Sequence, residues 1–217
     1  MRRLALAVTL LVTASALPAQ QGGDADRAAA AGGRLPAGWQ ARLDKASARI
    51  TDLAFSSTGT GFRATSGPAA IFYHPRYKGT GTYEIGGTFT QAKAPEHPEA
   101  YGLFFGGSDL NGPNQDYFYF LVRGDGQFAI KHRQGNEVHT LQDWTPSAAV
   151  KQADGSGRAS NVVRVLVEAQ NVRFMINEQE VKQFPRTQLA KTDGQAGIRV
   201  NHNLDVAIDG FLLKPIR

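Results

Sequence analysis

Short runs rich in aromatic and β-branched residues recur along the chain from residue 39 onward, separated by Gly, Asp and Asn. Runs of strand length at such close spacing, without a sustained helical period between them, are typical of an all-β sandwich or barrel. The pattern predicts strands at 61–65, 69–73, 83–91, 101–107, 117–123, 128–133, 138–142, 162–169, 172–177, 196–200 and 204–214.

The alternation of apolar and polar positions is clearest late in the chain. Val163, Val165 and Val167 recur at every second position, with Arg164 and Glu168 among the residues between and after them. Because successive side chains of a strand point to opposite faces, one face is predicted to be core and the other to meet solvent or ligand.

Two turns between these runs predict hairpins. Gly124 and Gly126 lie between the strands at 117–123 and 128–133, where a tight turn needs positive φ angles. Residues 169–171 join the next pair of strands in the same manner. Consecutive hairpins predict an antiparallel meander.

The N-terminus has the three parts of a secretory signal peptide. Arg2 and Arg3 are followed by an apolar stretch from residue 4 to residue 12 and then by small residues. The apolar stretch is shorter than the roughly 20 residues that span a bilayer. We therefore expect residues 1–19 to be a signal peptide cleaved after Ala16 or Ala19, and the mature protein to be periplasmic or secreted and free of the membrane. The alternative is an uncleaved anchor.

The segment at 20–37 is built from Gln, Gly, Ala and a few charged residues. Such a composition offers little to bury and predicts a disordered linker, followed by one domain at 38–217. The chain has no cysteine, so neither a disulfide framework nor a lipoprotein anchor is available, and the domain must be stabilised by burial.

The charge is mildly basic. With 24 Lys and Arg against 19 Asp and Glu, the formal net charge is +5. The basic residues are spread along the chain, whereas nucleic-acid binding requires a clustered stripe or a recognised motif. We therefore predict no nucleic-acid partner.

An ordered series of short segments from Tyr101 to Leu213 resembles the concanavalin A-like lectin/glucanase superfamily, in particular laminin G-like and 3-keto-disaccharide hydrolase-like domains of exported bacterial proteins. The segments are YGLFF at 101–105, DYFYFLV at 116–122, GDGQF at 124–128, LQDW at 141–144, NVVRV at 161–165, VRFMIN at 172–177, GQAGI at 194–198 and VAIDGF at 206–211. The resemblance implies a two-sheet antiparallel jelly-roll sandwich.

One position departs from the pattern of these domains, which often carry Asn-Gly after the strand equivalent to 172–176. This chain has Asn177 and Glu178 there. Because Glu is poorly suited to a positive φ angle, we expect a longer or differently registered turn.

No catalytic residue is predicted. Glucanases of this superfamily carry closely spaced acids on one strand, where period-two spacing places carboxylates about 6.6 Å apart on one face, a range suited to glycoside hydrolysis. The nearest approximation is Glu178 with Glu180, at a hairpin tip and without a third acid. No Gly-x-Ser-x-Gly motif occurs. The five histidines have no ligand spacing, and we expect them to face solvent.

A loop rich in carboxylate and amide oxygens makes calcium a candidate cofactor. Laminin G-like relatives often bind calcium at such loops, and oxygen ligands suit this hard cation. The candidate ligands are Asp109, Asn111, Asn114 and Asp116. The alternative is an ordinary polar connection with Asx turns.

The outward positions of three predicted strands combine rings, amides and cations, which is what a saccharide site uses. If the meander forms as predicted, these positions lie side by side, with Trp144 as a stacking platform on a neighbouring loop. The candidate ligand-binding residues are Tyr119, Arg123, Lys131, Arg133, Trp144, Arg199 and Asn201. The alternatives are a solvated sheet face and, for Trp144, a cap on the core.

The leading functional hypothesis is therefore an exported, non-catalytic domain that binds a glycan or saccharide. A hydrolase or lyase acting on a modified, keto-type disaccharide is the competing hypothesis, which the resemblance implies. A structural or protein-interaction sandwich is the third. The sequence does not predict the oligomeric state.

Overall fold

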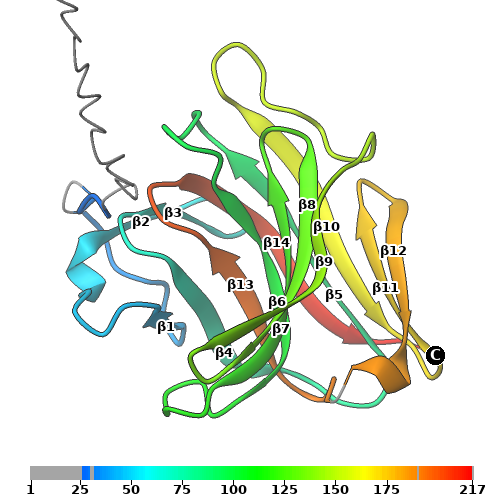
Figure 1. The fold of residues 1–217 in the computed structure, drawn as a ribbon. Coiled ribbons are helices and arrows are strands. Elements are labelled where there is room, and N and C mark those ends of the chain that lie inside the picture. The colour runs from blue at the N-terminus through cyan, green and yellow to red at the C-terminus, as the bar shows by residue number, and fades with distance from the viewer. Residues whose placement is uncertain (1–25, 30–31, 190, 217) are drawn as a thin grey trace, which may run out of the picture.

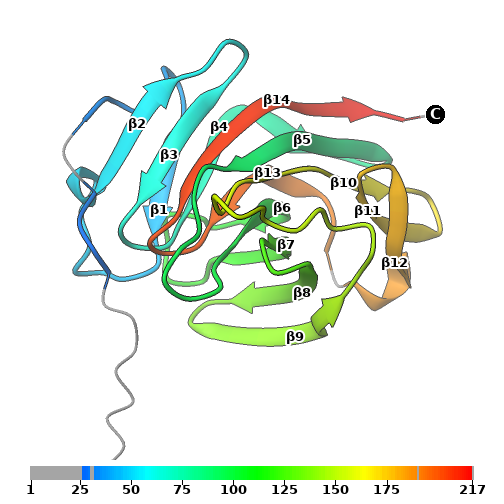
Figure 2. The ribbon, with the colours of Figure 1, turned by 90° about the horizontal axis from the view of Figure 1, so that it is seen from above.

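The computed structural model describes residues 26–29, 32–189 and 191–216 (Figure 1). The predicted signal peptide at 1–19 lies outside these residues. The described chain forms two antiparallel sheets of seven strands each, and Figure 2 shows them as two layers. The predicted jelly-roll sandwich is confirmed. Within the described residues, no helix is long and apolar enough to cross a membrane.

Each sheet mixes strands from distant parts of the chain. The first sheet contains, in spatial order, β1 (Gln40–Leu43), β4 (Ala70–Gly79), β13 (Gly194–Val200), β6 (Ala100–Ser108), β7 (Asp116–Arg123), β8 (Gln127–Gln134) and β9 (Glu137–Pro146). The second contains β12 (Gln179–Pro185), β11 (Asn171–Ile176), β10 (Ala159–Val167), β5 (Tyr83–Gln91), β14 (Asp205–Pro215), β3 (Phe62–Ser66) and β2 (Leu53–Ser57). Two single 3₁₀ turns, η1 (Ile50–Asp52) and η2 (Arg186–Gln188), complete the described elements.

The core lies between the inner faces of the two sheets and is rich in aromatic rings. Phe105 and Phe120 from the first sheet contact Phe174 from the second, with ring centres 6.1 and 5.2 Å apart. Val163 and Val165 are fully buried, as the alternation predicts. Both predicted hairpins form, since β7 pairs with β8 and β10 with β11.

The turn at Asn177 and Glu178 is tighter than expected. It is a two-residue connection between β11 and β12, with φ angles of 48° and 67°, so the longer turn is wrong, while the β11–β12 ladder shifts register between Phe174 and Met175. The Asn177 side chain accepts a hydrogen bond from the Val162 N–H (2.9 Å) and donates one to the Ala149 carbonyl (2.8 Å). Glu178 pairs with Arg164. These contacts hold Glu in a conformation that it rarely adopts.

The described part of the predicted linker lies on the surface of the sandwich. Ala29 donates a backbone hydrogen bond to the Asp52 carbonyl (3.1 Å), and Phe55 donates one to the Gly32 carbonyl (2.9 Å). Leu35 packs against the core. The segment was predicted as a linker from its composition, which does not reveal these backbone partners.

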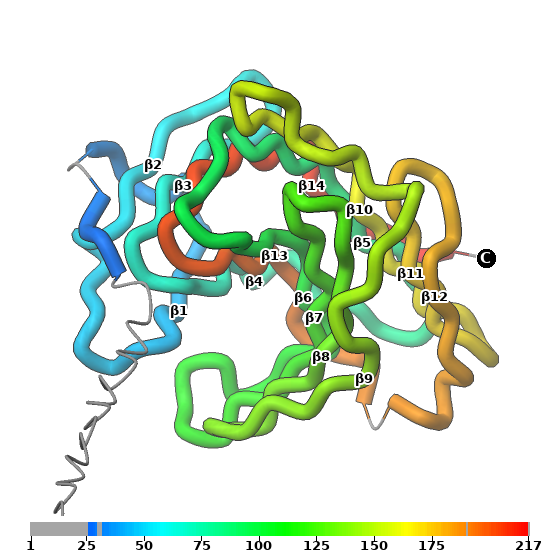
Figure 3. The backbone as a smooth tube through the Cα atoms, turned by 45° about the horizontal axis from the view of Figure 1, so that its top comes forward, coloured from blue at the N-terminus to red at the C-terminus, as the bar shows by residue number. Residues whose placement is uncertain are grey.

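The first sheet bends so strongly that its outer face is concave. Four strands separate β1 from β8, so the two strands would lie about 24 Å apart in a flat sheet. Yet Arg133 on β8 donates a hydrogen bond to Asp44, the residue after β1, at 3.2 Å. An arginine and an aspartate side chain can meet only if the sheet curves around them, as Figures 2 and 3 show for its two borders.

Candidate functional site

The outer face of the first sheet brings the predicted ligand residues together. Tyr119 on β7 lies opposite Lys131 on β8 in the ladder. Arg199 on β13 lies opposite Gly102 on β6, the strand between β13 and β7. We call this surface the concave face and define it by Arg42, Asp44, Tyr117, Tyr119, Arg123, Lys131, Arg133, Trp144, Arg199 and Asn201. All seven candidate ligand-binding residues of the sequence analysis are among them.

An ion-pair network that the sequence does not predict occupies the middle of the concave face. Arg199 donates two hydrogen bonds to the Asp44 carboxylate, at 2.6 and 2.7 Å. Arg133 donates a third to the same carboxylate, and the Nε–H of Arg199 reaches Asn201 Oδ1 at 3.2 Å. Only 6% of Arg199 is exposed. Asp44 therefore holds two cations in place beside the predicted ligand surface.

The network keeps its members charged. Burial opposes ionisation of Asp44, but the guanidinium groups of Arg199, Arg133 and Arg42 outweigh burial, so the pKa of Asp44 lies below its ordinary value. Burial also opposes the charged form of Arg199, and the Asp44 carboxylate outweighs it, which raises the pKa of Arg199. Both partners are ionised at neutral pH.

Two tyrosines line the face beneath these ions. Tyr117 and Tyr119 are 1% and 5% exposed, and the Arg199 guanidinium carbon lies 5.7 Å from the ring centre of Tyr119. Burial raises the pKa of both hydroxyls, and the Arg199 charge opposes the shift. Tyr119 was expected to be an outward ligand contact. It lies on the predicted face but is buried, with the Arg199 guanidinium and the Tyr117 ring beside it.

Trp144 lies at the next part of the face, on β9. The guanidinium carbon of Arg123 lies 4.1 Å from its ring centre and the Lys131 ammonium 5.7 Å, which are cation–π distances. Arg123 is also paired with Asp125 at 2.6 Å. Trp144 was predicted on a loop, whereas β9 extends to Pro146 and includes it. The indole packs against a second buried cluster, which includes Tyr117, Tyr119 and Leu121, and does not cap the main core.

The four candidate calcium ligands lie between β6 and β7 or at the start of β7, and the side chains of Asp109, Asn111 and Asp116 bind other protein groups. Asp109 accepts a hydrogen bond from the Asn114 N–H (3.0 Å), Asn111 accepts one from the Tyr73 hydroxyl (2.6 Å), and Asp116 lies 2.8 Å from His132 Nε2. In the part of the chain that the structure describes, no group of three or more His, Cys, Asp or Glu residues could hold a metal ion. Calcium binding stays a prediction from the sequence.

The remaining candidate chemistry is committed to ion pairs. Glu178 pairs with Arg164, and Glu180 pairs with Arg173 at 2.6 Å. His132 was expected to face solvent, but its ring stacks on Phe118 with centres 4.2 Å apart. The alternation of Phe128, Ile130 and His132 along β8 places this histidine on the inner face, a signal that the absence of metal-ligand spacing does not override.

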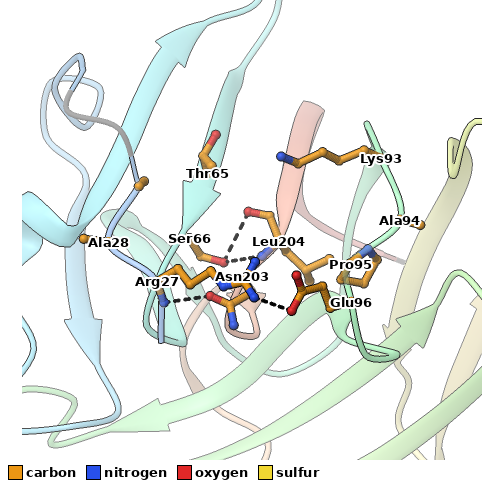
Figure 4. A pocket seen from close by; sticks show the side chains of 11 residues that line it. Arg27, Ala28, Thr65, Ser66, Lys93, Ala94, Pro95, Glu96, Asn203 and Leu204 are labelled. Atoms are coloured by element: carbon orange, nitrogen blue, oxygen red, sulfur yellow. Dashed lines mark hydrogen bonds and ion pairs between the residues drawn. The ribbon is translucent and has the colours of Figure 1, made fainter. Parts of the chain in front are cut away.

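A hollow of about 460 Å³ opens at another part of the sandwich (Figure 4). Arg27 from the N-terminal segment borders it, donates a backbone hydrogen bond to Asn203 at 2.9 Å and pairs with Glu96. Ser66 donates its hydroxyl hydrogen to the Asn201 carbonyl at 2.6 Å. These polar groups bind one another around the hollow, and among the described residues no aromatic ring borders it. The concave face is therefore the better candidate site.

Solved structures share the fold at low sequence identity. The carbohydrate-binding module CBM66 from Bacillus subtilis aligns with a TM-score of 0.58 and 10% identity, covering 82% of this chain and 95% of that one. A Bacillus subtilis protein of unknown function with a galectin-like fold gives a TM-score of 0.56 and 11% identity, covering 82% and 89%. The Emp47p carbohydrate recognition domain gives 0.53 and 12%, covering 84% and 90%.

At the level of sequence, no family model and no curated protein matches this chain. Identities of 10–12% relate folds and do not transfer a ligand. The likeness to these structures and the two seven-stranded antiparallel sheets assign the chain to the concanavalin A-like jelly-roll fold.

Proposed function

We propose that the protein binds a glycan or saccharide on the concave face, without catalysing a reaction. The observation that carries the proposal is the grouping of a half-buried tryptophan, Trp144, with the polar side chains of Arg123, Lys131 and Asn201 on one curved surface. A pyranose ring can stack on an aromatic face while cations and amides take its hydroxyl groups.

The ion pairs of the face support binding because they fix its shape before a ligand arrives. Arg199 and Arg133 are already held by Asp44, and Arg123 by Asp125. A surface that is already ordered loses little conformational entropy when it binds, which leaves more of the contact energy for affinity. Two of the structures with the same fold are described as a carbohydrate-binding module and a carbohydrate recognition domain, which favours this function over a purely structural one.

A glycan array probed with the protein tests the proposal, followed by affinity measurements with the substitution Trp144→Ala on any hit. Loss of the ring should weaken binding by about 2 kcal/mol, as is typical of a central aromatic contact. The matched control is Phe184→Ala. Phe184 is a half-buried aromatic residue on β12 of the other sheet with Lys182 beside its ring, 5.2 Å from the ring centre.

An unchanged affinity in Trp144→Ala would place the ligand elsewhere on the molecule. Turnover of a keto-disaccharide by the unmodified protein would instead favour the hydrolase or lyase hypothesis. No array hit and no turnover would leave the structural role as the surviving hypothesis.

We also propose that the protein is exported to the periplasm or beyond. The motive is the basic and apolar N-terminal sequence of residues 1–19. Mass spectrometry of the protein recovered from the producing cells should find a chain that begins at Leu17 or Gln20. Recovery of the chain with residues 1–19 intact and in the membrane fraction would contradict export and favour the anchor.

A further inference from the structure

The concave face carries more positive than negative charge. Among the described residues that define it or bind to it, the carboxylates are Asp44, Asp125 and Asp143. Asp125 is paired with Arg123, and Asp143 accepts a hydrogen bond from the Trp144 N–H at 2.8 Å. Asp44 alone stands against three guanidinium groups, those of Arg42, Arg133 and Arg199. Arg42 itself donates to the backbone carbonyls of Leu110 (2.7 Å) and Gly112 (2.8 Å), which carry no net charge.

Lys131 adds a further cation without a counter-ion. Its ammonium group forms no hydrogen bond or ion pair with any residue that the structure describes, and it lies 5.7 Å from the ring centre of Trp144. Lys131 and Arg133 are two positions apart on β8, so their side chains leave the same face about 7 Å apart. One carboxylate or sulfate group can accept hydrogen bonds from both.

The same part of the face has donors but few acceptors. The Nε–H of Arg133 is buried and has no acceptor among the described residues. Tyr119 lies opposite Lys131 in the ladder and Tyr117 lies opposite Arg133. Within the described chain, neither hydroxyl takes part in a hydrogen bond. A ligand that complements this region brings oxygen acceptors and negative charge.

From this arrangement we infer that the saccharide bound on the concave face is acidic, with a carboxylate or sulfate group held between Lys131 and Arg133. The inference rests on the proposed function and adds the chemical class of the ligand. A neutral sugar leaves the Lys131 charge and the excess of guanidinium charge uncompensated in a half-buried site. It should therefore bind with lower affinity than an acidic sugar of the same shape.

The test uses matched pairs of oligosaccharides that share a backbone and differ only at C6, where one member has a hydroxymethyl group and the other a carboxylate. Glucose and glucuronate, galactose and galacturonate, and mannose and mannuronate oligomers provide three pairs. Calorimetry at about 50 mM salt should show the acidic member of one pair binding at least tenfold more tightly. The advantage should shrink as added salt screens the charges.

Two lysine substitutions locate the preference. Lys131→Met should bring the ratio of acidic to neutral affinity towards one, because it removes the charge and replaces the aliphatic part of the side chain with an unbranched chain of the same number of atoms. Lys182→Met is the matched control, since Lys182 also lies on a strand beside an aromatic ring but belongs to the second sheet. That control should leave the ratio unchanged.

The outcomes separate this inference from the function on which it rests. Equal affinity for both members of each pair, with binding still lost in Trp144→Ala, overturns the acidic ligand and keeps saccharide binding. Binding of no pair, with a neutral hit on the glycan array, also overturns the acidic ligand alone, whereas no array hit, or binding that Trp144→Ala does not affect, overturns both. An acidic preference that Lys182→Met reduces as much as Lys131→Met overturns the assignment to Lys131 and Arg133.

Discussion

At the scale of single residues, the least predictable side chain is the one that organises the site. Asp44 directly follows the short border strand β1, and its partner Arg199 is 155 positions away. The outward position of Arg199 could be predicted from the alternation around Ile198 and Val200. A sequence pattern does not reveal that the arginine is neutralised by the residue that follows β1, two strands away in the sheet.

Replacing Asp44 with Asn should lower the free energy of unfolding by about 3 kcal/mol at pH 7, because the buried Arg199 loses its counter-ion. The pKa of Asp44 is depressed in the folded protein, so its contribution is present above the unfolded pKa of about 3.9 and is lost as the pH falls through the folded value. Urea titrations of both proteins at pH 7 and pH 3 check this. A difference as large at pH 3 as at pH 7 would contradict an ionic origin.

Replacing Glu178 with Gly should raise the free energy of unfolding by about 0.5–1 kcal/mol, because Gly adopts a φ angle of 67° without strain. The ion pair with Arg164 that the change removes involves an exposed glutamate and contributes less. Thermal unfolding measures the effect. Gln179→Gly, at the start of β12, is the control and should be destabilising, since Gly weakens a strand.

At the scale of elements, the central strands could be predicted, whereas of the four border strands only β9 was predicted, and only over residues 138–142. β5, β7 and β10 are buried on their inner faces and carry dense apolar or aromatic runs, so their pattern is readable. β12 and β2 border the second sheet and β1 borders the first. β12 has no buried residue at all, so it lacks the periodic signal by which a strand is recognised.

Close contact between two elements of the first sheet depends on a glycine of β6. A Cβ atom at Gly102 would overlap the carbonyl oxygen of Phe120 on β7. We expect Gly102→Ala to destabilise the protein by about 3 kcal/mol, because the backbone must move to accept the methyl group. Gly155→Ala is the control, since its Cβ would meet no atom within 4 Å. Chemical denaturation of both variants should show the loss in the first alone.

At the scale of the whole molecule, the candidate face was predictable and its curvature was not. Three strands carry cations at outward positions. If these strands pair in an antiparallel sheet, as the turn residues indicate, the cations lie on one surface. The bend that brings β1 towards β8 is the sum of small twists over many strand pairs. No single residue encodes it, so the burial of Tyr119 under Arg199 could not be inferred.

The segment before β1 contributes to the stability of the whole sandwich. The free energy of unfolding of a chain that begins at Gly38 should be about 2 kcal/mol lower than that of a chain that begins at Asp26. It loses the packing of Leu35 and the backbone hydrogen bonds at Ala29 and Gly32. Urea denaturation of the two chains measures the difference. Equal stability would mean that residues 26–37 act only as a tether.

The ion pair between Arg133 and Asp44 spans the curved sheet, and it responds to solution conditions differently from the strand pairing of the sheet itself. The strands are joined by backbone hydrogen bonds between uncharged groups, which salt and mild acid leave intact. The ion pair is partly exposed, so high ionic strength and protonation of Asp44 both weaken it. Salt and acid therefore act on how closely Asp44 is held to β8, whereas the strand pairing of the sheet is fixed by the backbone.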